Sequence, residues 1–167
     1  MKHIEGGICA AKGFTANGVR CGIRKNKTKR DISLIYSEKV GTSAAVYTQN
    51  LVKGAPLTVT KNNIANGYAQ AMICNSGNAN TCNANGIEIA TKTCELLANE
   101  AQAQGLKLAA EDVIVASTGV IGQPLDITPI AEHMQELKER AENYERNTDY
   151  FAHLSAQVER KKKRRFR

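Results

Sequence analysis

The sequence lacks any long apolar run, and this absence argues against a membrane-spanning segment. A helix needs roughly 18 consecutive apolar residues to cross a bilayer, and no run in the 167 residues approaches that length. The first seven residues, Met1 to Gly7, also lack the apolar stretch of a secretory signal. We therefore expect a cytoplasmic protein without a membrane partner.

The cysteines lack the spacings that indicate a cross-link or a metal site. Their number is odd, no two of them form a CxxC pair, and none has a histidine at ligand spacing. The five are Cys9, Cys21, Cys74, Cys82 and Cys94. Neither a disulfide framework nor a zinc site is therefore indicated. We expect buried free thiols, with no metal and no cofactor.

Positive charge is abundant in the whole chain but nearly balanced over most of it. The net charge is +7, and six positive charges lie in Lys161–Arg167, which leaves +1 for residues 1–160. A nucleic-acid-binding domain spreads its basic residues over a folded face, whereas a terminal basic run is typical of a solvated tail. A small basic nucleic-acid-binding protein is therefore the less favoured alternative.

The first half of the chain predicts strands. Short apolar or alternating runs rich in β-branched residues are separated by glycine and asparagine. These runs cover residues 32–36, 44–47, 56–60 and 70–74. We expect each of them to be a β-strand.

The second half predicts helices around one further strand. Apolar residues recur at spacings of three and four over residues 87–101, and Gly105 follows as a stop. Residues 113–116 are a candidate buried strand, and Thr128-Pro129 predicts the N-cap and first turn of a helix reaching about Tyr144. Strands mixed with amphipathic helices indicate an α/β domain, with helices packed on a mixed sheet.

Two polar segments follow apolar strands and are candidates for chemistry. Residues 75–80, Asn-Ser-Gly-Asn-Ala-Asn, form either a site rich in exposed N–H groups or a structural turn, and composition alone favours the turn. Residues 117–122, Ser-Thr-Gly-Val-Ile-Gly, place the Thr118 hydroxyl beside the Gly119 N–H, a pair that could stabilise an oxyanion. Because ligand sites in α/β sheets lie at strand ends, the two segments are expected to share a site.

These segments and their flanks resemble the ornithine acetyltransferases of arginine biosynthesis, also called bifunctional glutamate N-acetyltransferases. The two hexapeptides, in this order, are highly specific for that family. The resembling segments are residues 6–14, 22–25, 31–37, 44–50, 53–56, 75–80, 115–122 and 124–125.

The resemblance implies an activity and a role for two residues. In that family a precursor cleaves itself before an internal threonine, and the resulting β-chain threonine carries an acetyl group from N-acetylornithine to glutamate. Some members also accept acetyl-CoA. The family's oxyanion hole corresponds to Thr118 and Gly119 of this sequence, which are thus the predicted catalytic residues; no substrate-binding residue is assigned.

The resemblance also implies an incomplete site. Family members continue beyond residues 150–153 into an Ala-Ile-Met-Thr-Thr-Asp-Thr segment, which differs here, and the Lys-Gly-Ala-Thr cleavage segment is absent. We therefore expect residues 1–153 to be a truncated α-chain-like region of the self-cleaving fold, inactive alone and in need of a β chain. Residues 154–167 are expected to be a divergent, disordered basic tail. The alternative is a non-catalytic binding module that pairs with a separate β-like chain.

Overall fold

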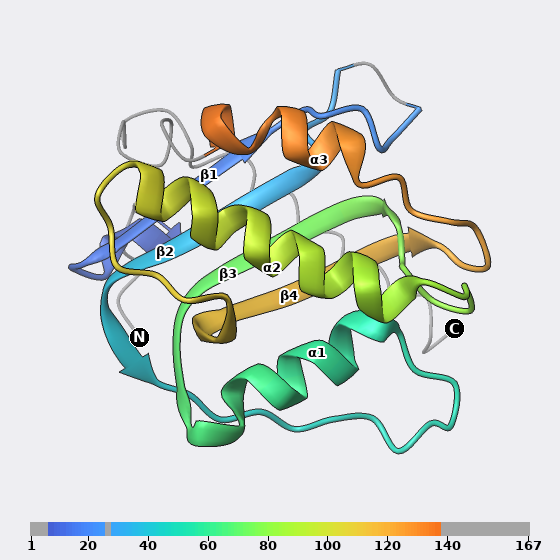
Figure 1. Ribbon diagram of the computed structural model, residues 1–167, viewed down its shortest axis with the longest axis horizontal. Helices are drawn as coiled ribbons and strands as arrows, with labels where there is room; N and C mark the ends of the chain where they lie inside the picture. The colour runs from blue at the N-terminus through green and yellow to red at the C-terminus, as the bar shows by residue number, and fades with distance from the viewer. Residues whose placement is uncertain (1–6, 26–27, 138–167) are drawn as a thin grey trace.

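The computed structural model describes residues 7–25 and 28–137. In these residues a mixed sheet has its strands in chain order (Figure 1). The strands are β1 (Phe14–Val19), β2 (Ile32–Thr42), β3 (Tyr68–Asn78) and β4 (Val113–Val120). Antiparallel pairing joins β1 to β2 and β2 to β3, and parallel pairing joins β3 to β4. The predicted α/β class with a mixed sheet is confirmed.

Helices cover one face and one edge of this sheet. They are α1 (Ala55–Asn63), α2 (Gly86–Ala103) and α3 (Thr128–Glu132), with short 3-10 helices at Gly7–Ala10, Ile64–Asn66 and Ala110–Asp112. Figure 1 shows α2 and α3 lying over the same face of the sheet, whereas α1 lies along β4 and also contacts α2. A parallel strand pair needs a long crossover connection, and α2 lies within the one that joins β3 to β4.

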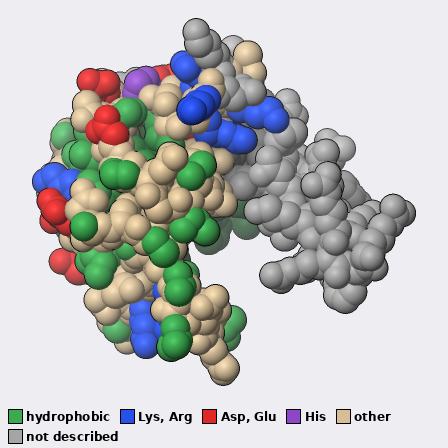
Figure 2. Space-filling view, turned by 90° about the vertical axis from the view of Figure 1, so that its right-hand side faces the viewer, with side chains coloured by type: hydrophobic (Ala, Val, Ile, Leu, Met, Phe, Trp, Pro, Cys, Tyr) green, Lys and Arg blue, Asp and Glu red, His purple; other side chains and the backbone are tan. Residues whose placement is uncertain are grey.

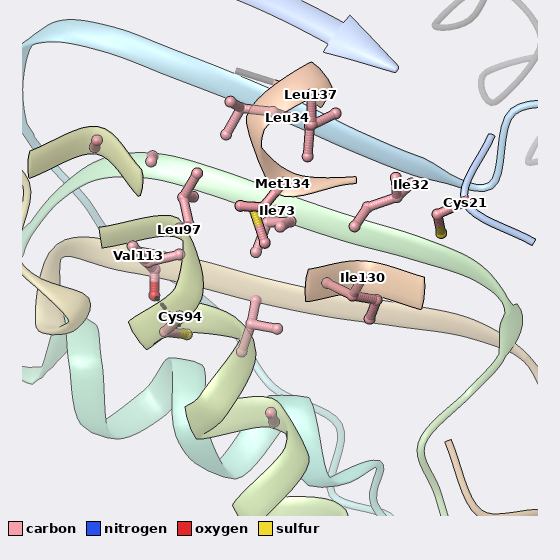
Figure 3. Close-up of a cluster of buried hydrophobic side chains, with 14 of the residues drawn as sticks. Cys21, Ile32, Leu34, Ile73, Cys94, Leu97, Val113, Ile130, Met134 and Leu137 are labelled. Carbon is pink, nitrogen blue, oxygen red and sulfur yellow. Dashed lines mark hydrogen bonds between the residues drawn. The ribbon is translucent and has the colours of Figure 1, made fainter. Parts of the chain in front are cut away.

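The hydrophobic core lies between the sheet and the helices α2 and α3 (Figure 3). Alternate strand residues face it, because successive side chains of a strand point to opposite sides. Ile32, Leu34 and Ile73 are each only 1% exposed. The helical side supplies Cys94, Leu97, Ile130, Met134 and Leu137.

Two of the expected strands are wrong. Residues 56–60 lie in α1, and residues 44–47 form neither strand nor helix. Pro56 lies in the first turn of α1, where its fixed φ suits a helix, and Thr60 is buried against β4. Such tertiary contacts outweigh the weak strand preference of β-branched residues. Residues 44–47 bury no apolar face, since Val46 is fully exposed.

The remaining expected elements are present, several with longer bounds. Residues 32–36, 70–74 and 113–116 lie within β2, β3 and β4, and residues 87–101 lie within α2. After α2 the chain turns at Gly105, whose φ of +79° lies in the left-handed region that favours glycine. The longer bounds of β3 and β4 matter for the candidate site, because they include most of the two polar hexapeptides.

The start of α3 differs from the prediction by one residue. Thr128 is the first helical residue rather than the N-cap, and the Thr128 N–H donates to Oδ1 of Asp126 over 2.9 Å. This hydrogen bond, which favours the ionised carboxylate, lowers the pKa of Asp126. Residues 134–137 are also helical, and the predicted continuation to Tyr144 lies outside the described residues.

The cysteines are free thiols, but the expectation that they are buried holds for only two of the five. Cys21 and Cys94 are buried, Cys9 and Cys74 are half-buried, and Cys82 is exposed. Burial raises the pKa of Cys21 to about 12, with a further contribution from the nearby Asp31 carboxylate, and burial likewise raises the pKa of Cys94 to about 12. These two thiols therefore stay protonated and shielded in the folded protein.

Iodoacetamide is expected to label Cys82 long before it labels Cys21 or Cys94. The reagent needs an accessible thiolate, and unfolding in urea should make all three react. Peptide mass spectrometry of a labelling time course checks this, and labelling of Cys94 as fast as Cys82 in the native chain would contradict it.

The same burial makes the stability of the fold depend on pH. The pKa values of Cys21 and Cys94 in the folded chain exceed the ordinary 9.0. The free energy of unfolding that the two neutral thiols contribute is therefore complete below pH 9.0 and is lost as the pH rises towards 12.

Two features are absent from the described part of the chain. No helix there is both long and apolar enough to cross a bilayer. No group of three or more histidine, cysteine or acidic side chains there is placed to hold a metal ion.

Candidate functional site

The carboxyl ends of β3 and β4 bring the two polar hexapeptides side by side. In the parallel register Asn75 is opposite Ser117, Ser76 is opposite Thr118, and Gly77 is opposite Gly119. Both hexapeptides were expected to be loops, and this is wrong for most of their length, because the strand pairing runs on to residues 78 and 120. The two segments therefore lie side by side, and the expectation that they share one site stays a prediction.

The predicted catalytic pair lies on the surface of this strand end. Thr118 and Gly119 are both exposed. Gly119 has a φ of +142°, and a Cβ on it would lie 2.2 Å from the carbonyl carbon of Gly77 and 2.5 Å from the nitrogen of Asn78. Only glycine fits such a close approach of two backbones.

A second glycine continues this tight packing towards the preceding loop. Gly77 has a φ of +115°, and a Cβ on it would lie 2.8 Å from Cγ of Arg24 and 3.1 Å from Cγ2 of Ile23. The register is irregular between Gly77 and Asn78, which pairs with both Thr118 and Val120. The strand end is therefore bent where the two glycines meet.

Three buried asparagines hold the polar segment of β3 and the chain after it. Asn75 donates through Nδ2 to the Asn78 carbonyl over 2.9 Å, and its Oδ1 accepts the Ser117 hydroxyl over 2.5 Å. Asn78 accepts the Asn80 N–H over 2.8 Å, and Asn80 donates to the Gly86 carbonyl over 2.8 Å. Most of these amides bind backbone, as the structural alternative predicts.

The same network reaches the chain that follows β4. Nδ2 of Asn78 donates to the carbonyls of Gln123 and Pro124 over 3.0 and 3.1 Å. The backbone adds two contacts: the Ala79 N–H donates to Val120, and the Gly122 N–H donates to Thr81, each over 2.8 Å. Residues 117–124 are thus anchored on both sides of Thr118 and Gly119.

Asp31 anchors the loop that presses on Gly77. This carboxylate is 0% exposed and accepts the N–H groups of Cys21, Gly22 and Arg24 over 2.7, 3.0 and 2.9 Å. Its own carbonyl accepts the Ser76 N–H over 2.7 Å. Sequence reasoning assigned no role to Asp31, because nothing in the spacing shows that one carboxylate collects three N–H groups.

A hollow of about 410 Å³ adjoins the start of α2. Lys53, Cys82 and Asn83 are among its lining residues, and Thr118 is not. Figure 2 looks at the end of the molecule where β3 and β4 terminate, and apolar and uncharged side chains make up most of this face. Val120, the last residue of β4, and Ile121, which follows it, are both exposed.

Comparison with known proteins identifies the family of this strand arrangement. Residues 15–163 match the ArgJ family. The arginine biosynthesis bifunctional protein ArgJ of Gloeobacter violaceus is 44% identical over 143 residues, which cover 84% of this chain and 34% of that protein. The ArgJ protein of Caldanaerobacter subterraneus is 40% identical over 136 residues, which cover 81% of this chain and 32% of that protein. The chain thus spans about a third of the length of these relatives.

Solved structures show the same fold. The ArgJ crystal structure from Bacillus halodurans superposes with a TM-score of 0.69 at 38% identity, over 76% of this chain and 64% of that one. Ornithine acetyltransferase from Mycobacterium tuberculosis, in complex with ornithine, superposes with a TM-score of 0.71 at 33% identity, over 76% of this chain and 66% of that one. Sequence and fold agree, and the chain belongs to the ArgJ family.

Proposed function

We propose that this chain supplies the oxyanion-stabilising half of an acetyltransferase site that moves an acetyl group from N-acetylornithine to glutamate. One observation carries the proposal: the exposed Thr118–Gly119 pair at the end of β4, locked against Gly77 and Asn78. A rigid pair of donors suits this task, since preorganised hydrogen bonds stabilise charge that develops in a transition state. Membership of the ArgJ family supports it.

The proposed chemistry takes place in two acyl-transfer steps. A nucleophilic hydroxyl, supplied outside this chain, attacks the acetyl carbonyl of N-acetylornithine and loses its proton to a base. The carbonyl oxygen becomes negative, and the Thr118 hydroxyl and the Gly119 N–H donate to it. Collapse breaks the C–N bond and releases ornithine with the proton on its amine, and the glutamate amine then attacks the acetyl ester in the same way.

The nucleophile belongs to a partner in this proposal. The 167 residues contain no Lys-Gly-Ala-Thr segment, so residues 1–153 act as an α-chain-like region with a β chain of the same family, and residues 154–167 form a basic segment outside it. The chain alone is then inactive. The proposed site is in the cytoplasm, with acetyl-CoA as a second possible donor.

The test is acetyl transfer by a chimaera and by its Thr118→Ala variant. Residues 7–137 of this chain replace the corresponding segment of the Gloeobacter violaceus relative, and formation of N-acetylglutamate is followed by chromatography. We expect transfer by the chimaera, none by the chain alone, and a kcat about 10²–10³ lower in Thr118→Ala, because one oxyanion donor is lost.

Two variants serve as controls for this test. Thr118→Ser keeps a hydroxyl and should retain most of the kcat, and Thr91→Ala removes an exposed threonine of α2 and should leave it unchanged. Thr118→Ala with normal turnover would refute the oxyanion role. Robust turnover by the chain alone would refute the dependence on a partner.

A further inference from the structure

We infer that Asn75 and Ser117 form a positioning pair that holds the Thr118–Gly119 segment in its working geometry. The inference rests on the proposed function, which gives Thr118 and Gly119 their role. Neither Asn75 nor Ser117 needs to touch a substrate in this arrangement. Both act through the backbone of β4.

The chemistry of the contact fixes the direction of each hydrogen bond. The Asn78 carbonyl can only accept, so the Asn75 side chain must turn its Nδ2 towards it, at 2.9 Å. The Asn75 Oδ1 then faces Ser117 and can only accept, so the Ser117 hydroxyl donates to it over 2.5 Å. Asn75 is 5% exposed, so no solvent competes strongly for either bond.

The position of the pair explains why it matters. Regular parallel pairing continues for two residues after it, to Gly77 opposite Gly119, and becomes irregular at Asn78, which is opposite both Thr118 and Val120. Gly119, the last residue in regular register, has no side chain to pack and has a φ outside the range of a normal strand. The segment is therefore held before Thr118 by the Ser117 hydroxyl, and after Gly119 by the bond from the Ala79 N–H to the Val120 carbonyl.

Losing the first anchor should allow the catalytic pair to move. A displacement of about 1 Å at a reacting centre can reduce a rate about 10²-fold. Ser117→Ala leaves the buried Asn75 Oδ1 without its donor, so the segment loses its side-chain anchor before Thr118 while the backbone bond at Val120 remains. The effect should fall on kcat, because the pair acts on the transition state rather than on substrate binding.

A matched control removes hydrogen bonds from the same strand without touching its end. Oγ1 of Thr60 donates to the Val115 carbonyl over 2.8 Å and accepts the Val115 N–H over 3.0 Å. Thr60→Val deletes both contacts and should lower stability. If Ser117 were merely structural, Ser117→Ala and Thr60→Val would have the same effects.

Kinetics of the chimaera give the first readout. We expect Ser117→Ala to lower kcat about 10- to 100-fold with KM changed less than about threefold. Ser117→Thr, which keeps the hydroxyl, should restore most of the kcat, and Thr60→Val should retain it. Normal kcat in Ser117→Ala, or an equal loss in Thr60→Val, would overturn the inference.

Backbone dynamics of the full chain give a second readout that needs no activity. Order parameters from ¹⁵N relaxation should be about 0.85 at Thr118 and Gly119 in the parent and fall below about 0.6 in Ser117→Ala, with Thr60→Val unchanged at these two residues. Unchanged order parameters in Ser117→Ala would refute the positioning role. A chimaera that transfers no acetyl group even unsubstituted would count against the proposed function, and these order parameters would still decide the inference.

Discussion

Gly119→Ala is expected to lower the free energy of unfolding by about 4 kcal/mol. A Cβ there would lie 2.2 Å from the Gly77 carbonyl carbon and 2.5 Å from the Asn78 nitrogen, and neither backbone atom can move without breaking the pairing of β3 with β4. Overlap of this kind costs about 1–3 kcal/mol, and a φ of +142° adds about 1–3 kcal/mol of strain for a residue with a side chain. Urea denaturation followed by circular dichroism measures the sum.

Gly122→Ala separates strain from overlap. Gly122 also has a positive φ, +78°, but a Cβ there would meet no atom within 4 Å. Its replacement should therefore cost only about 1 kcal/mol, from strain. If Gly119→Ala and Gly122→Ala lowered the free energy of unfolding equally, the contact of Gly119 with Gly77 would not be what restricts residue 119 to glycine.

Asp31→Ala is expected to cost about 3–5 kcal/mol of folding free energy. The side chain accepts three N–H groups, those of Cys21, Gly22 and Arg24, and each donor left unpaired in a buried place costs about 1–3 kcal/mol. Some of that cost is relieved where water reaches the loop, so the sum stays below the maximum. The loop should also loosen its contact with Gly77.

Asp126→Ala is the matched control for Asp31→Ala. Asp126 is an exposed aspartate that accepts a backbone N–H, that of Thr128. The freed N–H can bind water, so the loss should be much smaller than for Asp31→Ala. Equal denaturation midpoints for Asp31→Ala and the parent chain would contradict the anchoring role of Asp31.

Regular elements with one strong pattern were predictable from the sequence. The helical spacing of residues 87–101 identifies α2, because one face of that helix is apolar along its whole length. The β-branched residues in the segment 56–60 favour a strand, but the segment forms part of α1. Only its packing against β4 decides between the two structures. That packing depends on Thr60 meeting Val115, far along the chain, and no local pattern shows it.

The candidate site was predictable in part. The position of both hexapeptides after apolar strands indicated that they lie together, as the register of β3 and β4 shows. The catalytic role of Thr118 and Gly119 comes from the resemblance to a family and stays a prediction. The bond between Asn75 and Ser117 was not predictable, since it depends on the parallel register of two strands joined by a long crossover. The extension of pairing through both hexapeptides was missed because asparagine, serine and glycine are poor strand formers.

The parallel pairing of β3 and β4 also has a consequence for how the molecule folds. The connection between the antiparallel strands β1 and β2, residues 20–31, is much shorter than the crossover between β3 and β4. Strand β4 can join β3 only after the whole segment from Ala79 to Asp112, with α2, has been closed into a loop. Non-local pairings of this kind form slowly, because the entropy of loop closure opposes them. We therefore expect Thr118 and Gly119, the proposed oxyanion pair, to reach their places late in folding, when β4 joins the sheet and completes the core.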